Sequence, residues 1–369
     1  MMGISNNHVG TAAPGCPAEQ GSAVRGMYGC EGGPALSEAE GTPSRQPALR
    51  RRYGRSFGIS FASRSWRATA ELCSAVPTWS LVWVFAVVVA CVQGAPAQSF
   101  NAARAMQYTR DVVAFGPRPI GSANHRKLEN YILNHLKGDA VEDDAFTADT
   151  VEGKFPVRNL IAKFPGTRDG IIVIAGHYDT NYPLRNTGYV GANDGGSSTA
   201  ILLELANQLR GKKREGYSVW LLWTDGEEAV KTWTETDSLY GTRHLAEKWQ
   251  NDGTLKKIKA FLLADMIGDA DLNVERDSDS TPWLEDLVYE AASKLGYQSH
   301  FFGRTIPVLD DHLPFVQRGV PSADLIDLDY GYADVFHHTP QDTLDKLSPK
   351  SIEIVGAVIL ETVRLLDKK

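Results

Sequence analysis

Short apolar segments of strand length alternate with longer segments of helical periodicity from about residue 101 onward. Such alternation is typical of α/β domains, in which a mostly parallel sheet is covered by helices on both faces. We therefore predict a single three-layer α/β domain over residues 101–369. The predicted strands are 158–164, 171–175, 218–223, 260–264 and 323–326, and the predicted helices are 102–115, 125–136, 197–209, 239–249, 281–295 and 351–366.

The first hundred residues differ from this domain in composition. Residues 1–75 are rich in Gly, Ala, Pro, Ser and Arg without apolar periodicity, so we expect them to be disordered or a spurious extension ahead of the true start. Residues 76–97 contain the apolar run Trp79–Val92, which is short for a membrane span and suits a signal peptide better than a buried helix. Val88-Val89-Ala90-Cys91 also resembles a bacterial lipobox, with Cys91 as the lipidated residue. The sequence therefore predicts export to the periplasm, the exterior or a membrane, with membrane attachment only through this anchor or lipid.

Charge and cysteine content exclude two classes of site from the folded part. All four cysteines lie within the first 91 residues, so the domain has neither a disulfide nor a thiolate metal site. The chain has 45 acidic and 38 basic residues, and its arginine-rich segment precedes the domain. Nucleic-acid binding needs clustered Lys and Arg on the folded surface. We therefore expect no nucleic-acid partner, and any metal must be bound by His and carboxylates.

Side chains that can bind metals follow the predicted strands at the points where these end. Ligands of open α/β sheets bind beyond the carboxyl ends of the strands, so we expect these residues to meet at one site. One or two His with carboxylates suit zinc, and a carboxylate beside the metal suits acid–base work. Each segment alone is common in surface loops, and only their number favours a site. The segments are His177-Tyr178-Asp179, Asn193-Asp194, Glu227-Glu228, Asp265 and His337-His338.

These residues resemble the ligand and base set of the zinc aminopeptidases, which use two co-catalytic zinc ions. A narrower resemblance, to the glutaminyl-peptide cyclotransferases, runs from about residue 104 to the C-terminus. It implies a zinc aminopeptidase-like fold and the conversion of N-terminal glutamine of peptides or proteins into pyroglutamate, with release of ammonia. The segments that carry it are Asp225-Gly226-Glu227-Glu228-Ala229, Trp233, 237–246, Asp310-Asp311-His312-Leu313-Pro314-Phe315 and Arg318-Gly319-Val320-Pro321.

The resemblance implies Zn²⁺ as the cofactor. In the cyclases one zinc ion would be bound by the residues that match Asp194, Glu228 and His338. His177 matches a histidine that the aminopeptidases use for a second zinc, and Asp265 would join it there. The sequence leaves both one and two zinc ions open.

The resemblance also implies the catalytic and substrate-binding residues. Glu227 would be the acid–base, in a hydrogen-bond network with Asp265 and Asp310, whose like charges would raise its pKa. Trp233 would form a wall of the substrate pocket. His337, which stands where the animal cyclases have an indole, would border the same pocket.

Several alternatives stay open on the sequence alone. A di-zinc aminopeptidase is the main rival function, and a binding domain with a relic site is a third. Asp310 and Asp311 also suit the start of a helix over 312–318, and Trp233 also suits ordinary packing. His244 and His312 are interpreted as structural residues. The protein is expected to be a monomer.

Overall fold

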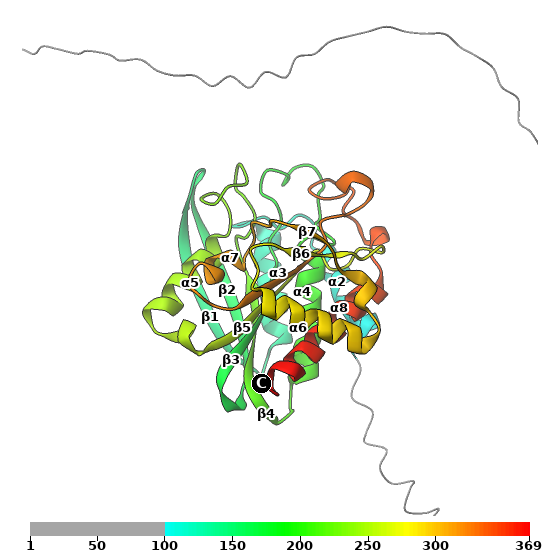
Figure 1. Cartoon of the computed structure of the whole chain (residues 1–369). Coiled ribbons are helices and arrows are strands. Elements are labelled where there is room, and N and C mark those ends of the chain that lie inside the picture. The colour runs from blue at the N-terminus through cyan, green and yellow to red at the C-terminus, as the bar shows by residue number, and fades with distance from the viewer. Residues whose placement is uncertain (1–99) are drawn as a thin grey trace, which may run out of the picture. The chain divides into compact units, whose positions relative to one another are not determined.

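The computed structural model describes residues 100–369 (Figure 1). The predictions for residues 1–75 and 76–97, including the lipidation of Cys91, concern residues outside this range. Between residues 100 and 369, no helix has the length and apolarity needed to cross a membrane. The main elements are α2 (Ala102–Val113), α3 (Ala123–His135), β1 (Ala140–Thr150), β2 (Gly153–Phe164), β3 (Gly166–His177), α4 (Gly196–Leu209), β4 (Arg214–Thr224), α5 (Tyr240–Asn251), β5 (Ile258–Asp265), β6 (Val274–Asp277), α6 (Pro282–Leu295), β7 (Phe301–Ile306), α7 (Leu313–Val316), β8 (Ser322–Ile326) and α8 (Pro349–Leu366).

The central sheet has six strands in the order β1-β2-β4-β3-β5-β8. Strands β4, β3, β5 and β8 run parallel, whereas β1 and β2 form an antiparallel hairpin at one edge. The prediction of a mostly parallel sheet in an α/β domain is confirmed. The parallel arrangement brings the ends of β3, β4, β5 and β8 to one edge, where the predicted site residues follow.

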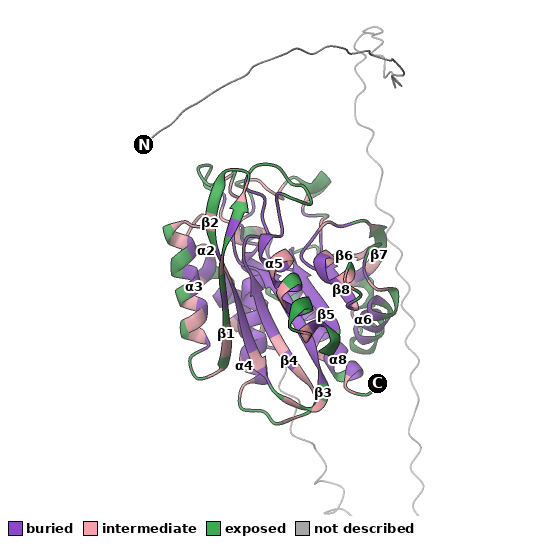
Figure 2. Ribbon diagram, turned by 90° about the vertical axis from the view of Figure 1, so that its left-hand side faces the viewer, coloured by how far each residue is buried: buried purple, intermediate pink, exposed green. Residues whose placement is uncertain are grey.

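Alternating side chains of the central strands fill two separate cores. Ile172 and Ile174 of β3 belong to the core that contains α2, α3, α4, α6 and α8. Val173 and Ala175 point to the opposite face, where they pack in a second core with α5 and α7. Figure 2 shows the buried central strands between these helices. The predicted three-layer architecture is therefore confirmed.

Sequence analysis missed the edge strand β1. Its sequence is acidic and its side chains are mostly exposed or half-buried, so it has no clear apolar alternation. The strand forms because it pairs with β2 along its whole length and its acids meet cations from neighbouring elements. Glu142, for example, lies 2.6 Å from Lys163 of β2 and 2.8 Å from Lys248 of α5. The short pair β6–β7 was also missed, and its strands have four and six residues.

A fragment of residues 99–369 is expected to be soluble and to unfold cooperatively. Phe100 is part of the main core and its ring packs on Gly356 of α8, while the Asn101 side chain caps α2 by accepting from Arg104 N at 2.9 Å. A second fragment that starts at Ala103 should lose about 3–5 kcal/mol of unfolding free energy, because it lacks this buried ring and the cap. Thermal unfolding followed by circular dichroism compares the two. An unfolded 99–369 fragment would contradict the expectation.

Candidate active site

Three predicted metal ligands lie together at the carboxyl edge of the sheet. Asp194 precedes α4, Glu228 follows β4, and His338 lies in the loop after β8. His338 Nε2 is 3.3 Å from Glu228 Oε2 and 3.4 Å from Asp194 Oδ2. Four ligands at about 2.0–2.2 Å around a tetrahedral zinc ion lie about 3.3–3.5 Å from one another. The two distances from His338 Nε2 therefore fit the ligand spacing of zinc.

The charges of the three residues also favour a bound cation. Burial opposes protonation of His338, yet Glu228 and Asp194 outweigh it and raise the pKa of His338 to about 11. Glu228 is buried, and its Oε1 has no hydrogen-bond partner in the described part of the chain. A buried carboxylate oxygen without a donor is costly, and a metal ion would satisfy it. The charges of the three residues and the two distances from His338 thus fit a zinc ion.

Four residues hold the ligands in place, and sequence analysis singled out only Asp179 among them. Asn181 donates to Glu228 Oε2 at 2.8 Å, and the Tyr189 hydroxyl donates to Asp194 Oδ2. Asp342 accepts the backbone N–H groups of Asn193 at 2.8 Å and Asp194 at 3.2 Å. The Asp179 carboxylate accepts those of Glu227 and Glu228, both at 3.3 Å. Such contacts orient ligands around metals.

The loop before α4 depends on glycine and on Arg118. Gly191 and Gly195 have φ of +50° and +73°, and an added Cβ would lie 2.4 Å from Asp194 O and 2.7 Å from Asp179 O respectively. The fully buried Arg118 guanidinium donates to the carbonyl oxygens of Tyr178 at 3.1 Å and Gly191 at 2.8 Å. Arg118 therefore shapes the loop that carries Asp194.

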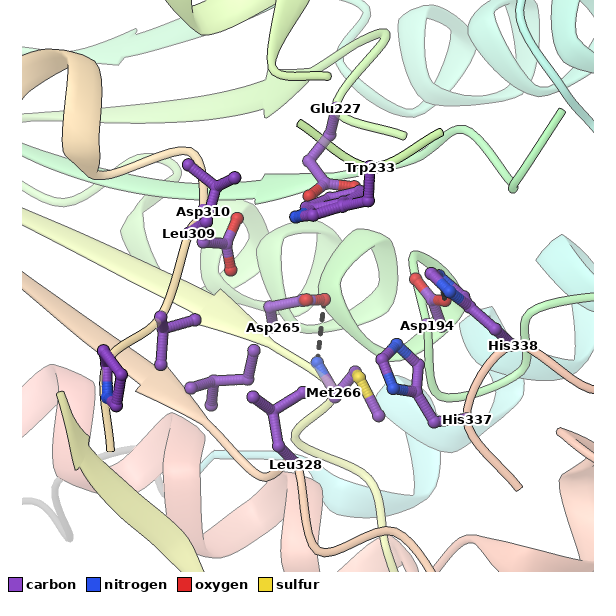
Figure 3. Close-up of a pocket in the computed structure, with 13 residues that line it drawn as sticks. Asp194, Glu227, Trp233, Asp265, Met266, Leu309, Asp310, Leu328, His337 and His338 are labelled. Atoms are coloured by element: carbon purple, nitrogen blue, oxygen red, sulfur yellow. Dashed lines mark hydrogen bonds and ion pairs between the residues drawn. The ribbon is translucent and has the colours of Figure 1, made fainter. Parts of the chain in front are cut away.

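Glu227 points away from Glu228, as expected for adjacent residues at a strand end. It lines one cavity together with Asp265 and Asp310, and the three carboxylates face the same space (Figure 3). Burial is the main reason that the pKa of Glu227 lies well above its usual range. The charges of Asp310 and Glu228 add to the rise and His177 opposes it. Sequence analysis attributed the raised pKa of Glu227 only to the like charges of Asp265 and Asp310, whereas burial contributes more.

Asp310 differs from an ordinary surface carboxylate. Its Oδ2 is buried without a hydrogen-bond partner among the described residues. Burial, and next the charges of Asp265 and Asp311, hold the pKa of Asp310 well above its usual range. The raised pKa favours the neutral form of Asp310, in which the carboxyl group carries a proton that it can donate in a hydrogen bond.

His177 lies between the carboxylates of the possible second metal site. Its Nε2 is 3.0 Å from Asp194 Oδ1 and 3.1 Å from Asp265 Oδ1. The same Asp265 oxygen also accepts from Ser198 Oγ at 3.0 Å and from Met266 N at 2.8 Å. Two donors already occupy the two lone pairs of this oxygen. The structure thus brings His177, Asp194 and Asp265 together as a buried group that could hold a metal ion, although Asp265 Oδ1 already accepts two hydrogen bonds.

The cavity has a volume of about 240 Å³ and is open at one side. Trp233 and His337 both line it, as the resemblance implied. The centre of the Trp233 ring lies 6.3 Å from the centre of the His338 ring. The centre of the His337 ring lies 4.1 Å from that of the His338 ring. His337 also lies close enough to Asp194 and His338 to be considered a metal ligand. Apolar side chains such as Val308, Ile326 and Leu328 complete the walls.

The helix-cap interpretation of Asp310 and Asp311 is wrong. Helix α7 begins at Leu313 and its N-cap His312 makes no side-chain cap bond. Asp311 instead accepts from the hydroxyl groups of Thr224 and Thr242, which tie α5 to the end of β4. His312 is fully buried with its Nε2 2.8 Å from Asp277 Oδ2, which agrees with a structural role.

The chain is similar to known proteins over this region. The profile of peptidase family M28 matches residues 159–363. A glutaminyl-peptide cyclotransferase of Drosophila melanogaster is 29% identical over 271 residues, with 66% of this chain and 75% of that protein covered. A glutaminyl-peptide cyclotransferase-like protein of Mus musculus is 31% identical over 271 residues, with coverages of 66% and 70%.

The fold and the sequence also agree with a solved structure. The crystal structure of an Acidobacteriales bacterium glutaminyl cyclase superimposes with a TM-score of 0.72 and is 52% identical. It covers 75% of this chain, and 99% of that chain is matched. The chain therefore belongs to peptidase family M28 and, within it, to the glutaminyl cyclases.

Proposed function

We propose that this chain closes the N-terminal glutamine of peptides into pyroglutamate with one zinc ion, held by Asp194, Glu228 and His338. Peptidase family M28 is zinc-dependent. The observation that carries the proposal is the pairing of this three-ligand set with the buried Glu227 at the wall of one small cavity. When bound, zinc would supply a Lewis acid to the γ-carboxamide oxygen of the substrate.

Glu227 would move the proton that the ring closure displaces. The α-amine nitrogen attacks the γ-carboxamide carbon within the same residue, so proximity favours the new C–N bond. Glu227 accepts a proton from this nitrogen and passes it to the amide nitrogen, which leaves as ammonia. A raised pKa suits a group that must both take up and release a proton near neutral pH. A protonated Asp310 beside Glu227 would add no negative charge to the cavity during this transfer.

The Asp265 contacts support one zinc ion, whereas the close grouping of His177, Asp194 and Asp265 would suit a second one. An aminopeptidase with two metal ions would need Asp265 or His177 as ligands of the second ion. Here His177, Ser198 and Met266 all lie within hydrogen-bond distance of one Asp265 oxygen. Displacing these contacts would leave the buried donors unpaired, which is costly.

Mass spectrometry of the products tests the proposed function. The purified protein is incubated with a peptide that begins with glutamine and with one that begins with leucine. We expect the first to lose the mass of ammonia and the second to stay intact. Release of leucine from the second, with no loss of ammonia from the first, would replace the cyclase with an aminopeptidase.

Trp233→Ala is expected to lower kcat/KM for glutaminyl peptides by about 10–100-fold while zinc stays bound. The ring is 36% exposed at the cavity mouth, where it can stack on the glutamine side chain and exclude water. Ammonia release and elemental analysis measure the two effects. Trp283→Ala is a matched control, because Trp283 is an indole of similar exposure, 41%, on α6. Unchanged activity in Trp233→Ala would place the substrate elsewhere.

We further propose that the protein acts outside the cytoplasm on peptide or protein N-termini, as a monomer. The proposed location rests on the apolar run Trp79–Val92 and the small residues after it. N-terminal sequencing of the protein from its native cells would show whether the chain begins near Gln98, at a lipidated Cys91 or further upstream. Size-exclusion chromatography with light scattering tests the oligomeric state.

A further inference from the structure

A second groove lies beside the active-site cavity and shares Leu309 with it. The groove has a volume of about 430 Å³, and its walls come from β1, α5 and α7. Two of its residues are bonded to the loop of the acid–base residue: Leu239 N donates to Glu227 O at 2.8 Å, and Tyr240 N donates to Gly226 O at 2.7 Å. A chain that leaves the cavity past Leu309 therefore enters this groove.

Arg243 of α5 lines the groove with an unsatisfied guanidinium. Its Nη2 donates to Thr236 O at 3.2 Å and its guanidinium carbon lies 4.9 Å from the centre of the Tyr240 ring. Its Nε is buried without a hydrogen-bond partner in residues 100–369, and no carboxylate there lies within ion-pair distance. Burying a cationic N–H without an acceptor is costly. A bound carboxylate would remove this cost.

The carboxylates nearest to Arg243 are engaged elsewhere or exposed. Asp237 accepts from the backbone N–H groups of residues 230–232 and from the Tyr240 hydroxyl, so its oxygens are already occupied. Asp149 at the rim pairs with Lys154. Glu235 and Glu247 are exposed at the rim and make no ion pair within the described range. None of these acids therefore neutralises the Arg243 guanidinium by forming an ion pair with it.

A second guanidinium borders the same groove. Arg318 donates from Nε to Gln250 Oε1 at 3.0 Å and from Nη1 to Pro314 O at 2.8 Å. It also has no carboxylate partner among residues 100–369. The groove is thus lined by two arginines that form no ion pair in the described residues, and guanidinium groups bind carboxylates well.

We propose that this groove binds the segment of the substrate peptide that follows the N-terminal glutamine, and that Arg243, with Arg318, selects an acidic side chain in that segment. The inference rests on the proposed cyclase function. The peptide leaves the cavity past Leu309, and the acidic side chain pairs with the accessible part of the half-buried Arg243 guanidinium and with Arg318.

Peptides with a single acidic residue test the inference. Each begins with glutamine, has an amidated C-terminus, and carries either glutamate or its neutral isostere glutamine at one later position. We expect kcat/KM for the glutamate peptide to exceed that for its isostere by about 5–20-fold at one position. Arg243→Gln should bring this ratio to about 1. Arg110→Gln, which removes an exposed arginine of α2, should leave the ratio as in the wild type.

The remaining measurements distinguish a failure of this inference from a failure of the proposed cyclase function. Glutamine amide has no later residues, so absence of turnover with it in the wild type would contradict the proposed function itself. A ratio near 1 at every position in an active wild type, or a ratio that survives in Arg243→Gln, would overturn the inference. If Arg243→Gln does not fold, Arg318→Gln and the loss of the wild-type ratio in high salt decide the same question. Non-amidated peptides show whether a C-terminal carboxylate can replace the side chain.

Discussion

Glu227→Gln is expected to lower kcat for glutaminyl peptides by roughly 10²–10⁴-fold while zinc content stays at the wild-type value. Glutamine keeps the shape of the side chain but cannot accept and return the proton of the α-amine. Glu227 lies 3.5 Å from His177 through its Oε2, not against the three metal ligands, so its replacement should spare the ion. Ammonia release under saturating substrate and elemental analysis of the same sample measure both quantities.

Glu290→Gln is the matched control for this change. It removes an exposed carboxylate of α6, which lines neither the cavity nor the groove, and wild-type turnover is expected. If Glu227→Gln kept more than about a third of wild-type turnover, another group would carry the proton. Asp310→Asn would then be the next variant to measure, because Asp310 is the other buried carboxyl of the cavity wall with a raised pKa.

A strand was predictable where both of its faces are buried, because such a strand is a continuous run of apolar residues. The apolar segment 171–175 predicts a central strand. In the structure it forms the centre of β3, and every side chain of it is buried. Strand β1 could not be found in the same way. Its stability comes from pairing with β2 and from contacts such as Asp143 with Arg158, and neither partner is visible in a local window of sequence.

The site was predictable where a chemical type coincides with a strand end. Glu228 met both conditions, Asp194 and His338 were found as metal-capable residues in the loops that follow strands, and the structure brings both acids within 3.4 Å of His338. Asn181 and Asp342 gave no such signal, since each is an ordinary polar residue of a loop until the fold places it beside a ligand. Backbone conformation was equally hidden: His338 has φ of +50°, an uncommon value for a residue other than glycine.

Removal of one metal ligand is expected to have the second large effect. Glu228→Gln and His338→Ala should each weaken zinc binding by more than about 100-fold and abolish measurable cyclase activity. Loss of a residue that only orients a ligand typically costs 10–100-fold in metal affinity, and loss of one of three protein ligands should cost more. Elemental analysis after dialysis against a weak chelator gives the zinc content per chain, with one ion expected in the wild type.

His337→Ala tests whether His337, the residue next to His338, is itself a metal ligand. The His337 Nδ1 lies 3.1 Å from Asp334, and the ring borders the cavity, so this variant should keep its zinc and change only substrate affinity. Thermal unfolding adds a readout that does not depend on turnover. Zinc stabilises the folded state to which it binds, so a strong chelator should lower the Tm of the wild type and of His337→Ala but not that of the two ligand variants. Full zinc content in Glu228→Gln, or its loss in His337→Ala, would show that the ion is held by Asp194, His337 and His338 instead.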